Sequence, residues 1–433
     1  MLRSMKLQTA LFSLAIFTMG TTIAQDKVKT KTGVIDLPGP DLAASKTKYS
    51  KVIGWPEGKT PIAPEGFKVN RYADGMKSPR NIILTPNGDV LVALSNSQRT
   101  KKEVQQNEKT GKAGSEVPGK SVNVILLLRD TDKDGVAETK TTFLSGLNQP
   151  FGMAFAPGKF YVANTDGVWV YPYNTGDAVI KGEGKKIIDL PAGGYNNHWT
   201  RNLILNPAGN KLFVTVGSGS NAAEHGIDNE KRRADILEFN LDGTGEKVYG
   251  SGLRNPVGMA WVPGTNTLWT AVNERDNLGD ELVPDYITSV KPGGFYGWPW
   301  YYFGKHEDPR LAGQRPDLKD KVLVPDVPMG SHTASLGLIF YTGRQFPSKY
   351  KNGAFVGQHG SWNRSEFSGY KVAFVPFKNG QPSGPMEDFL TGFLVDQEGK
   401  DVYGRPVMVL QTPDGALLVT DDVSGIVWRV SKK

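Results

Sequence analysis

The sequence predicts an all-β fold, a six-bladed β-propeller built from four-stranded antiparallel blades, on three observations. The 433 residues include 51 Gly and 28 Pro, more than long helices tolerate, and 10% of them are aromatic. A pattern of apolar strand, turn with Pro, Gly or Asn, and second apolar strand recurs six times. Segments such as those at Gly167 and Gly369 alternate polar and apolar residues as outer strands do. Two packed β-sandwiches are the alternative, but they explain six similar hairpins less well.

The six copies of the hairpin pattern supply the inner strands of the blades. They begin at Ser78, Gln149, Trp199, Arg254, Ser335 and Gly404. A propeller ring needs closure, because an open sheet edge invites aggregation. We therefore expect residues 67–72, before the first copy, to pair with residues 425–430, after the last.

The chain divides into residues 1–24, a signal peptide, residues 25–64, an extended leader, and residues 65–433, the propeller catalytic domain. Basic residues, a short apolar run and small residues before Gln25 follow one another as in secretory signals. The apolar run is too short to cross about 30 Å of hydrocarbon, and no later stretch predicts a membrane span. A periplasmic or secreted protein is expected. The chain has no Cys, so disulfides and Cys-ligated metal or haem are excluded.

Charge and polarity narrow the partners. The net charge is +7, but the chain has no long Lys/Arg run and no nucleic-acid motif, so nucleic acid is not expected as a partner. Residues 96–121 are hydrophilic and lack periodicity, which predicts a mobile loop.

The residues that open the inner strands should face one mouth of the central channel. They are Arg80, His198 with Arg201, Arg254 with Asn255, His332, His359 and Arg405. A ring of cations around one channel is costly unless an anion lies among them. The alternative is that each cation pairs with a main-chain carbonyl or a blade carboxylate. The set as a whole predicts a small ligand with several carboxylates.

One weaker signal for a metal site has a structural alternative. Asp130, Asp132 and Asp134, followed by Gly135, fit the opening of a calcium loop, but Thr141 stands where such a loop has its bidentate Glu. The alternative is an Asp-rich turn between strands.

Two further side chains are candidate substrate contacts. Trp298 could stack on a sugar ring or merely pack the Gly-Trp-Pro turn, and His332 could face substrate or be a hydrogen-bonded channel residue.

Several ordered motifs resemble one family. They are HWTRNL, GLRNPVGMAW, NERDNLGDELVPDY, GGFYGWPW, FVGQHGSWNRS and the terminal GRPV. From about Glu65 to the C-terminus the chain is similar to the soluble pyrroloquinoline-quinone (PQQ) sugar dehydrogenases, and within them to the sorbosone and pyranose dehydrogenases. The resemblance implies a six-bladed propeller that binds PQQ and Ca²⁺ at the channel mouth. It also implies oxidation of a sugar by hydride transfer, with electrons passed to an external acceptor, a cytochrome or a quinone.

The resemblance also implies roles for individual residues. His198 matches the general base, a role that suits a group titrating near neutrality. Arg254 and Asn255 match the pair that binds the quinone, His359 matches a Lys or His beside it, and Arg405 matches an arginine over its carboxylates. The segment from Glu274 through Arg275 to Asp276 matches the loop whose main-chain carbonyls hold calcium, a cation that prefers oxygen ligands.

Three positions depart from the glucose-oxidising branch. Val257 replaces a glutamine, Arg275-Asp276 replaces Gly-Pro at the calcium loop, and Ser218 replaces the acidic partner of the base. His198 would then be oriented through Asn197 or a water. These departures argue against glucose specificity.

The resulting hypothesis is a secreted quinoprotein that oxidises an aldose, aldosone or related sugar. A propeller lactonase with a channel-mouth metal is one alternative, although such hydrolases need several inward carboxylates. A carbohydrate-binding propeller without cofactor is the other, and the presence of His198 together with Arg254-Asn255 speaks against it.

Overall fold

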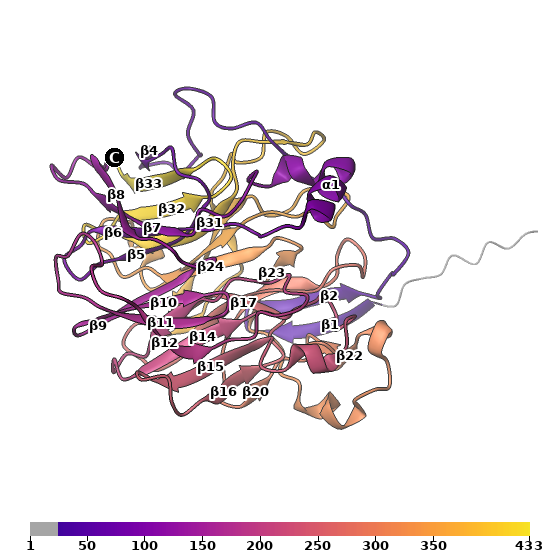
Figure 1. The fold of residues 1–433 in the computed structure, drawn as a ribbon. Helices are drawn as coiled ribbons and strands as arrows, with labels where there is room; N and C mark the ends of the chain where they lie inside the picture. The colour runs from indigo at the N-terminus through magenta and orange to yellow at the C-terminus, as the bar shows by residue number, and fades with distance from the viewer. Residues whose placement is uncertain (1–24) are drawn as a thin grey trace, which may run out of the picture.

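The computed structural model describes residues 25–433, which form a ring of six antiparallel blades (Figure 1). The first blade contains β5 (Pro79–Leu84), β6 (Val90–Leu94), β7 (Val124–Arg129) and β8 (Thr139–Leu144). The second contains β9 (Gly152–Ala156), β10 (Lys159–Asn164), β11 (Gly167–Pro172) and β12 (Lys185–Asp189). The third contains β13 (Leu203–Leu205), β14 (Lys211–Val216), β15 (Asp235–Asn240) and β16 (Lys247–Ser251). The next two contain β17 (Asn255–Trp261), β18 (Leu268–Asn273), β19 (Pro284–Ser289) and β23 (Val327–Ser331), then β24 (Ser335–Phe340), β25 (Ala354–Gln358), β26 (Lys371–Val375) and β29 (Glu387–Leu390). Each predicted hairpin falls on the first two strands of a blade, and the six-bladed prediction is confirmed.

The sixth blade closes the ring. It contains β31 (Pro406–Gln411), β32 (Leu417–Asp421), β33 (Ile426–Lys432) and β4 (Phe67–Ala73). Strand β4 pairs antiparallel with β33, with Arg71 opposite Trp428 and Val69 opposite Val430. The predicted pairing of the strand before the first copy with the strand after the last is therefore confirmed.

The segment predicted as an extended leader contains regular structure and packs on the propeller. A hairpin of β1 (Gln25–Thr30) and β2 (Gly33–Pro38) buries Val28 and Leu37 against the fourth blade's side of the ring. Strand β3 (Lys51–Val52) pairs with β30 (Asp401–Val402). The predicted signal peptide lies outside the described residues.

The remaining elements are short connections. They are β20 (Gly294–Phe295), which joins the edge of the third blade, the pairs β21 (Tyr301–Tyr302) with β22 (His306–Glu307) and β27 (Phe377–Lys378) with β28 (Gln381–Pro382), and 3₁₀ turns at Ile227–Glu230, Pro309–Leu311, Pro316–Lys321 and Ser348–Tyr350.

The insertion at residues 96–121, predicted as a loop, contains a helix. Helix α1 (Lys101–Thr110) begins with a capping box, in which Thr100 and Glu103 satisfy each other's backbone N–H groups. It ends at Gly111, whose φ of 79° is the left-handed conformation that glycine adopts easily. A 3₁₀ turn, Lys112–Ser115, follows.

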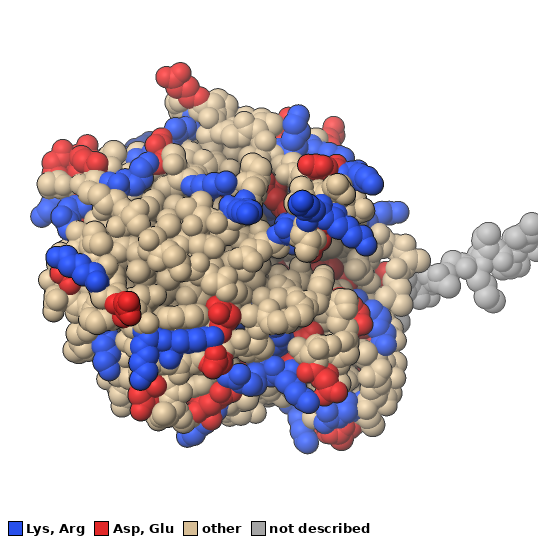
Figure 2. Space-filling view, in the orientation of Figure 1, with Lys and Arg blue, Asp and Glu red and all other residues tan. Residues whose placement is uncertain are grey.

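Helix α1 lies on the surface of the propeller. No residue of the helix is buried, and basic side chains gather over its position in Figure 2. Sequence periodicity missed it because a fully exposed helix has no apolar face. Within residues 25–433, no helix is long and apolar enough to cross a membrane.

Around the axis the inner strands contact one another through apolar side chains and through hydrogen bonds from asparagine side chains. Ile82, Phe151 and Val257 belong to one buried cluster that draws on several blades. Asn81 donates to the Phe151 carbonyl at 2.8 Å, and Asn202 donates to the Val257 carbonyl at 2.7 Å. These amides join one blade to the next and fix the positions of the residues that precede them.

Candidate functional site

A pocket of about 280 Å³ lies at one mouth of the channel and collects most of the strand-opening residues. Seven of those predicted from sequence line it: Arg80, His198, Arg254, Asn255, His332, His359 and Arg405. They come from β5, from β17, and from the loops before β13, before β17, after β23, after β25 and before β31. The prediction that these residues converge is confirmed.

His198 has one ring nitrogen fixed and one free. Its Nδ1 lies 2.8 Å from the Ser218 carbonyl and 2.9 Å from Ser218 Oγ. Because Ser218 Oγ donates its own proton to the Ser220 carbonyl at 2.7 Å, both Ser218 oxygens act as acceptors and Nδ1 carries the proton. Nε2 is therefore the unprotonated nitrogen, and no residue within 25–433 bonds to it. Asn197 or a water was expected to orient the base, but Ser218 holds Nδ1.

The electrostatic surroundings keep His198 neutral. Burial, and next the nearby Arg254 guanidinium, lower the pKa of His198 to about 3. Near neutral pH the imidazole is therefore unprotonated, and the Nε2 lone pair is free. This is the geometric requirement of a general base.

Gly217 makes room for this arrangement. A Cβ at Gly217 would lie 2.6 Å from His198 Cβ and would also collide with Asn255 Oδ1. The chain thus needs glycine at this position so that the base and Asn255 can lie over the end of β14.

Arg254 is surrounded by oxygens. Its Nη1 donates to the Glu274 carbonyl at 2.5 Å, Nη2 donates to Asp276 Oδ2 at 3.0 Å, and both Nε and Nη2 reach oxygens of Asn221. Burial alone would raise the pKa of Asp276, but Arg254 and His332 hold it below its usual value. The carboxylate of Asp276 is therefore ionised and balances Arg254.

Asp422 joins two other residues of the pocket. It accepts from Arg80 Nη1 at 2.6 Å and from His359 Nε2 at 2.8 Å. Burial, with Arg405 nearby, lowers the pKa of His359 to about 4, while His359 and Arg80 depress the pKa of Asp422 despite its burial. Arg405 donates to the carbonyls of His359, Gly360 and Ser115.

These contacts correct the inference drawn from a ring of unpaired cations. Each basic residue of the pocket has an oxygen partner in the protein, as the alternative held. Two polar atoms of pocket residues, Arg80 Nε and Asn255 Oδ1, are buried and have no hydrogen-bond partner among residues 25–433. Asn81 and Asn202 occupy the same place after an arginine, yet both bond across to the next blade. Of these three asparagines, only Asn255 makes no side-chain hydrogen bond to the next blade within the described residues.

The unpartnered atoms Arg80 Nε and Asn255 Oδ1 fit an anionic, nitrogen-containing cofactor. Guanidinium donors suit carboxylates, and the Asn255 carbonyl oxygen can accept from a ring N–H. The donor set of the pocket therefore fits a polycarboxylate such as PQQ.

In this arrangement the carbonyl oxygens of Glu274 and Asp276 accept hydrogen bonds from the protein. The Glu274 carbonyl is bonded to Arg254, and the Asp276 carbonyl accepts from both Asn221 Nδ2 and Arg310 Nη1 at 3.0 Å. The oxygens are of the type that calcium prefers, and each of these two carbonyls already accepts from a cationic or amide donor.

Two predicted arginines lie outside the pocket. Arg201 is fully buried and bonds to the carbonyls of His198, Thr200 and Pro191, so it supports the loop that carries the base. Arg275 is fully buried between Glu274 and Asp308, with N–O distances of 3.0 and 3.1 Å, and its side chain offers no metal ligand.

The predicted substrate residues are also held by the protein. Trp298 is buried, is not among the pocket residues, and donates to the Asn221 carbonyl at 2.9 Å, so it packs the turn as the alternative held. His332 reaches the pocket, but Asp276 Oδ1 and the Gly279 carbonyl engage both of its ring nitrogens. Burial lowers the pKa of His332, yet these two partners outweigh burial and raise it overall.

The Asp-rich loop brings its carboxylates together away from the channel. Oxygens of Asp130, Asp132, Asp134 and Glu138 lie within 4.8 Å of one another. Each carboxylate also accepts a backbone N–H of the loop, as an Asp-rich turn would. Sequence reasoning missed Glu138, and calcium at this loop stays a prediction.

Four other pocket-region residues were missed by sequence reasoning. Asp422 and Asn221 hold the arginines, and Tyr49 stacks on Trp362 with ring centroids 5.8 Å apart at the edge of the pocket. Asp422 follows Asp421 at the end of β32, but no spacing in the sequence pairs it with a strand opening, and Tyr49 lies in the leader, where no repeat indicated it.

Comparisons with known proteins identify the family of the chain. The glucose/sorbosone dehydrogenase family model matches residues 183–429, and a TrAA12-like model matches residues 61–294. An uncharacterized protein of Borreliella burgdorferi is 30% identical over 305 residues, which cover 67% of this chain and 77% of that protein. A PQQ-dependent pyranose dehydrogenase of Coprinopsis cinerea is 24% identical over 429 residues, and the match covers 85% of this chain but 54% of that protein. The chain thus spans about half the length of that relative.

Solved structures share the fold. The calcium structure of a Trichoderma reesei carbohydrate-active enzyme of family AA12 has a TM-score of 0.70 at 20% identity, covering 86% of this chain and 97% of that one. The holo PQQ domain of the Coprinopsis cinerea pyranose dehydrogenase has a TM-score of 0.67 at 20% identity, covering 89% of this chain and 100% of that one. Together with the family match over more than half of its length, this shows that the chain belongs to the glucose/sorbosone dehydrogenase family.

Proposed function

We propose that the protein is a PQQ-dependent sugar dehydrogenase that uses the channel-mouth pocket. The observation that carries the proposal is His198, a neutral base with Nε2 open, beside polar atoms of Arg80 and Asn255 that lack a protein partner. PQQ dependence of relatives such as the Coprinopsis cinerea enzyme supports the cofactor. The substrate is an aldose, aldosone or related sugar.

The residues of this chain divide the work. Arg80 and Arg405 would hold carboxylates of the cofactor, and Asn255 would accept from its ring N–H. What the group supplies when bound is a two-electron oxidant for the C–H bond of a sugar carbinol. His198 Nε2 would take the hydroxyl proton, and Ser218 would hold the imidazolium through Nδ1–H. The two electrons leave to an external acceptor, a cytochrome or a quinone.

The arrangement of acids disfavours the lactonase alternative. Among residues 25–433, the only cluster of His, Asp or Glu side chains suited to a metal is the one at Asp130–Glu138, away from this pocket. The pocket carboxylates Asp276 and Asp422 are instead paired with Arg254 and Arg80.

Calcium belongs to the proposal through the resemblance alone. Its binding at Glu274–Asp276 would require Arg254 to release the Glu274 carbonyl. EDTA treatment of the reconstituted protein should abolish turnover and added CaCl₂ should restore it. Full activity in EDTA would remove calcium from the proposal.

Export is proposed from residues 1–24. A periplasmic or secreted protein should begin at Gln25 after processing, which N-terminal sequencing of the exported form would check. Recovery of the full-length chain in the cytoplasm alone would contradict export.

Reconstitution tests the central proposal. Purified protein is mixed with PQQ and CaCl₂ and assayed with aldoses and an artificial dye acceptor. Reduction of the dye by a sugar is expected. Absence of both dye reduction and PQQ binding by absorbance would overturn the proposal.

A further inference from the structure

A buried glutamate lies behind the loop that holds the base. Glu230, at the end of the 3₁₀ turn Ile227–Glu230, is 6% exposed and does not line the cofactor pocket. Its Oε2 accepts from the Gly219 N–H at 2.6 Å, and its Oε1 accepts from the Ser220 N–H at 3.0 Å and from Ser220 Oγ at 2.5 Å. Both carboxylate oxygens therefore bind two consecutive residues of one loop.

That loop also holds the protonated nitrogen of the base. Ser218 accepts from His198 Nδ1 through its carbonyl and its Oγ. Ser218 Oγ donates in turn to the Ser220 carbonyl at 2.7 Å. The residues bound by Glu230 thus directly follow, and in part fix, the residue that binds the imidazole.

The peptide group between Ser218 and Gly219 joins the two contacts. Its carbonyl oxygen lies 2.8 Å from His198 Nδ1, and its N–H donates to Glu230 at 2.6 Å. Because a trans peptide group is planar, its C=O and N–H point in opposite directions, so a fixed N–H also fixes the carbonyl. A carboxylate bound to the N–H polarises the group and makes the carbonyl oxygen a stronger acceptor. Glu230 therefore acts on the base through one peptide group.

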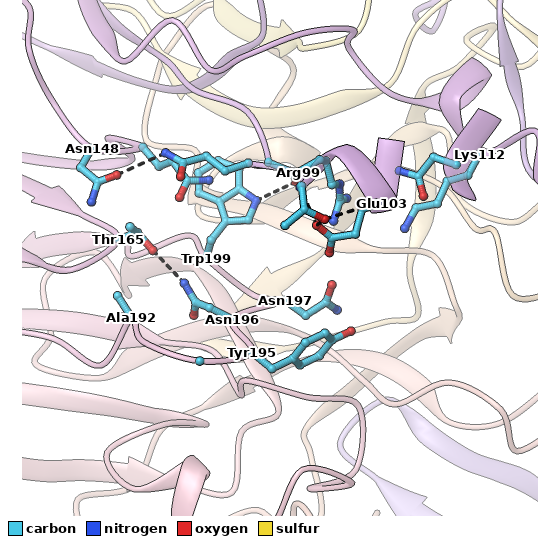
Figure 3. A pocket seen from close by; sticks show the side chains of 16 residues that line it. Arg99, Glu103, Lys112, Asn148, Thr165, Ala192, Tyr195, Asn196, Asn197 and Trp199 are labelled. Carbon is cyan, nitrogen blue, oxygen red and sulfur yellow. Dashed lines mark hydrogen bonds between the residues drawn. The ribbon is translucent and has the colours of Figure 1, made fainter. Parts of the chain in front are cut away.

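The segment from Glu230 to Arg233 also holds the loop that carries His198. Figure 3 shows this loop at the side of a second hollow, with Asn196 bonded to Thr165. Asn196 Oδ1 also accepts from Arg233 Nη1 at 2.7 Å. One short segment thus binds the loop of the base on one side and the loop of its hydrogen-bond partner on the other, which sets their relative positions.

We propose that Glu230 is a positioning residue for the base: it holds the Ser218–Gly219 peptide so that His198 keeps its proton on Nδ1 and leaves Nε2 free. A neutral histidine can carry its proton on either nitrogen, and the hydrogen bond at one nitrogen decides which. Without a fixed acceptor at Nδ1 the proton can move to Nε2, and that tautomer cannot take a hydroxyl proton there. The inference rests on the proposed function and adds a residue outside the pocket to it.

The tautomer of His198 in the apoprotein tests this role. Imidazole ¹⁵N NMR at pH 7 should show wild-type His198 protonated at Nδ1. In Glu230→Gln an amide N–H₂ replaces one carboxylate oxygen, so either Gly219 or Ser220 loses its acceptor, and the Nε2–H form should appear. In the reconstituted enzyme kcat should fall about 10-fold, whereas KM for the sugar and the PQQ dissociation constant should change less than about 3-fold.

Asp326→Asn is the matched control. Asp326 is also buried and accepts a backbone N–H, that of Ser289 at 2.7 Å. It immediately precedes β23 and does not line the cofactor pocket. This variant should lower the stability of the fold without changing the tautomer of His198.

Retention of the Nδ1–H form alone in Glu230→Gln would overturn the inference, and so would an equal change of tautomer in Asp326→Asn, which would indicate general destabilisation. A changed tautomer with unchanged kcat would also overturn it. If Glu230→Gln does not fold, Ser220→Ala, which removes one bond to Glu230, decides by the same criteria. If no sugar is oxidised, the proposed function fails, and the tautomer in the apoprotein still decides whether Glu230 positions His198.

Discussion

Replacing Asp422 with asparagine should destabilise the protein by an amount set by two buried bonds. The carboxylate, 5% exposed, accepts from Arg80 Nη1 at 2.6 Å and from His359 Nε2 at 2.8 Å. In Asp422→Asn one oxygen can still accept, but the amide N–H₂ then faces a second donor, and the Arg80 charge loses its counterion. Breaking a buried pair in this way costs about 3–5 kcal/mol. Because Asn keeps one bond and the Arg80 side chain is 14% exposed, we expect the low end, about 3 kcal/mol.

Urea unfolding of the apoprotein at pH 7 measures this loss. The matched control is Asp74→Asn, which removes an exposed ion pair with Arg71 and should cost less than about 0.5 kcal/mol. The neighbours of Asp422 lower its folded-state pKa, so its stabilisation is present above the unfolded pKa and is lost as pH falls through the folded pKa. The difference between wild type and variant should thus be constant from about pH 5 to 8 and shrink below about pH 4. A deficit no larger than that of the control would refute the reasoning.

Three further outcomes follow from the pocket. His198→Ala should lower kcat at least about 100-fold, while the PQQ dissociation constant, measured by fluorescence titration, changes less than about 3-fold. An unchanged kcat in this variant would exclude His198 as the base. In the apoprotein, imidazole ¹⁵N NMR should show His198 and His359 neutral down to about pH 5, because burial lowers their pKa to about 3 and about 4. The same residues in the unfolded chain take up protons near pH 6.5, so the stability of the folded protein should fall as pH drops below that value. Titration of either folded histidine near pH 6.5 would contradict this. Gly217→Ala should reduce kcat and PQQ affinity together, because the added Cβ displaces both His198 and Asn255. The control Gly209→Ala lies at a surface turn with no atom near the added Cβ and should leave PQQ affinity unchanged. Equal PQQ affinity in the two variants would contradict the view that Gly217 makes room for His198 and Asn255.

The fold could be predicted because its information is local and repeated. Six hairpins with the same order of apolar strand, turn and apolar strand specify six inner strand pairs. The strand at Phe67–Ala73 could be matched with the last strand because a propeller has only one gap to close. Helix α1 could not be predicted from periodicity, since it buries nothing and is fixed by its caps.

The site could be predicted only to the level of which loops meet. The pairs Arg80-Asn81, Arg201-Asn202 and Arg254-Asn255 look alike in sequence. In the structure Asn81 and Asn202 donate hydrogen bonds to carbonyls of the neighbouring blade, whereas Asn255 Oδ1 has no hydrogen-bond partner among residues 25–433. The difference depends on which carbonyl of the next blade lies within reach.

The charge balance of the pocket was equally hidden from the sequence. Asp422 follows the second strand of its own blade, and nothing in its spacing shows that it lies between Arg80 and His359. Counting cations at the strand openings therefore overestimated the positive charge. A long-range partner can be recognised only once the ring is assembled.

The pairing of β4 with β33 has a consequence for biosynthesis. These strands are adjacent in space, yet almost the entire propeller is synthesised between them. Until β33 is available, β4 has no neighbour in its blade, and the ring has an open edge that can pair with another chain. The ring can close only after the last strands have left the ribosome, so a nascent chain exposes this edge for most of its synthesis. Sequestering β4 during that interval, or delaying folding until the whole chain is present, would protect the protein from aggregation.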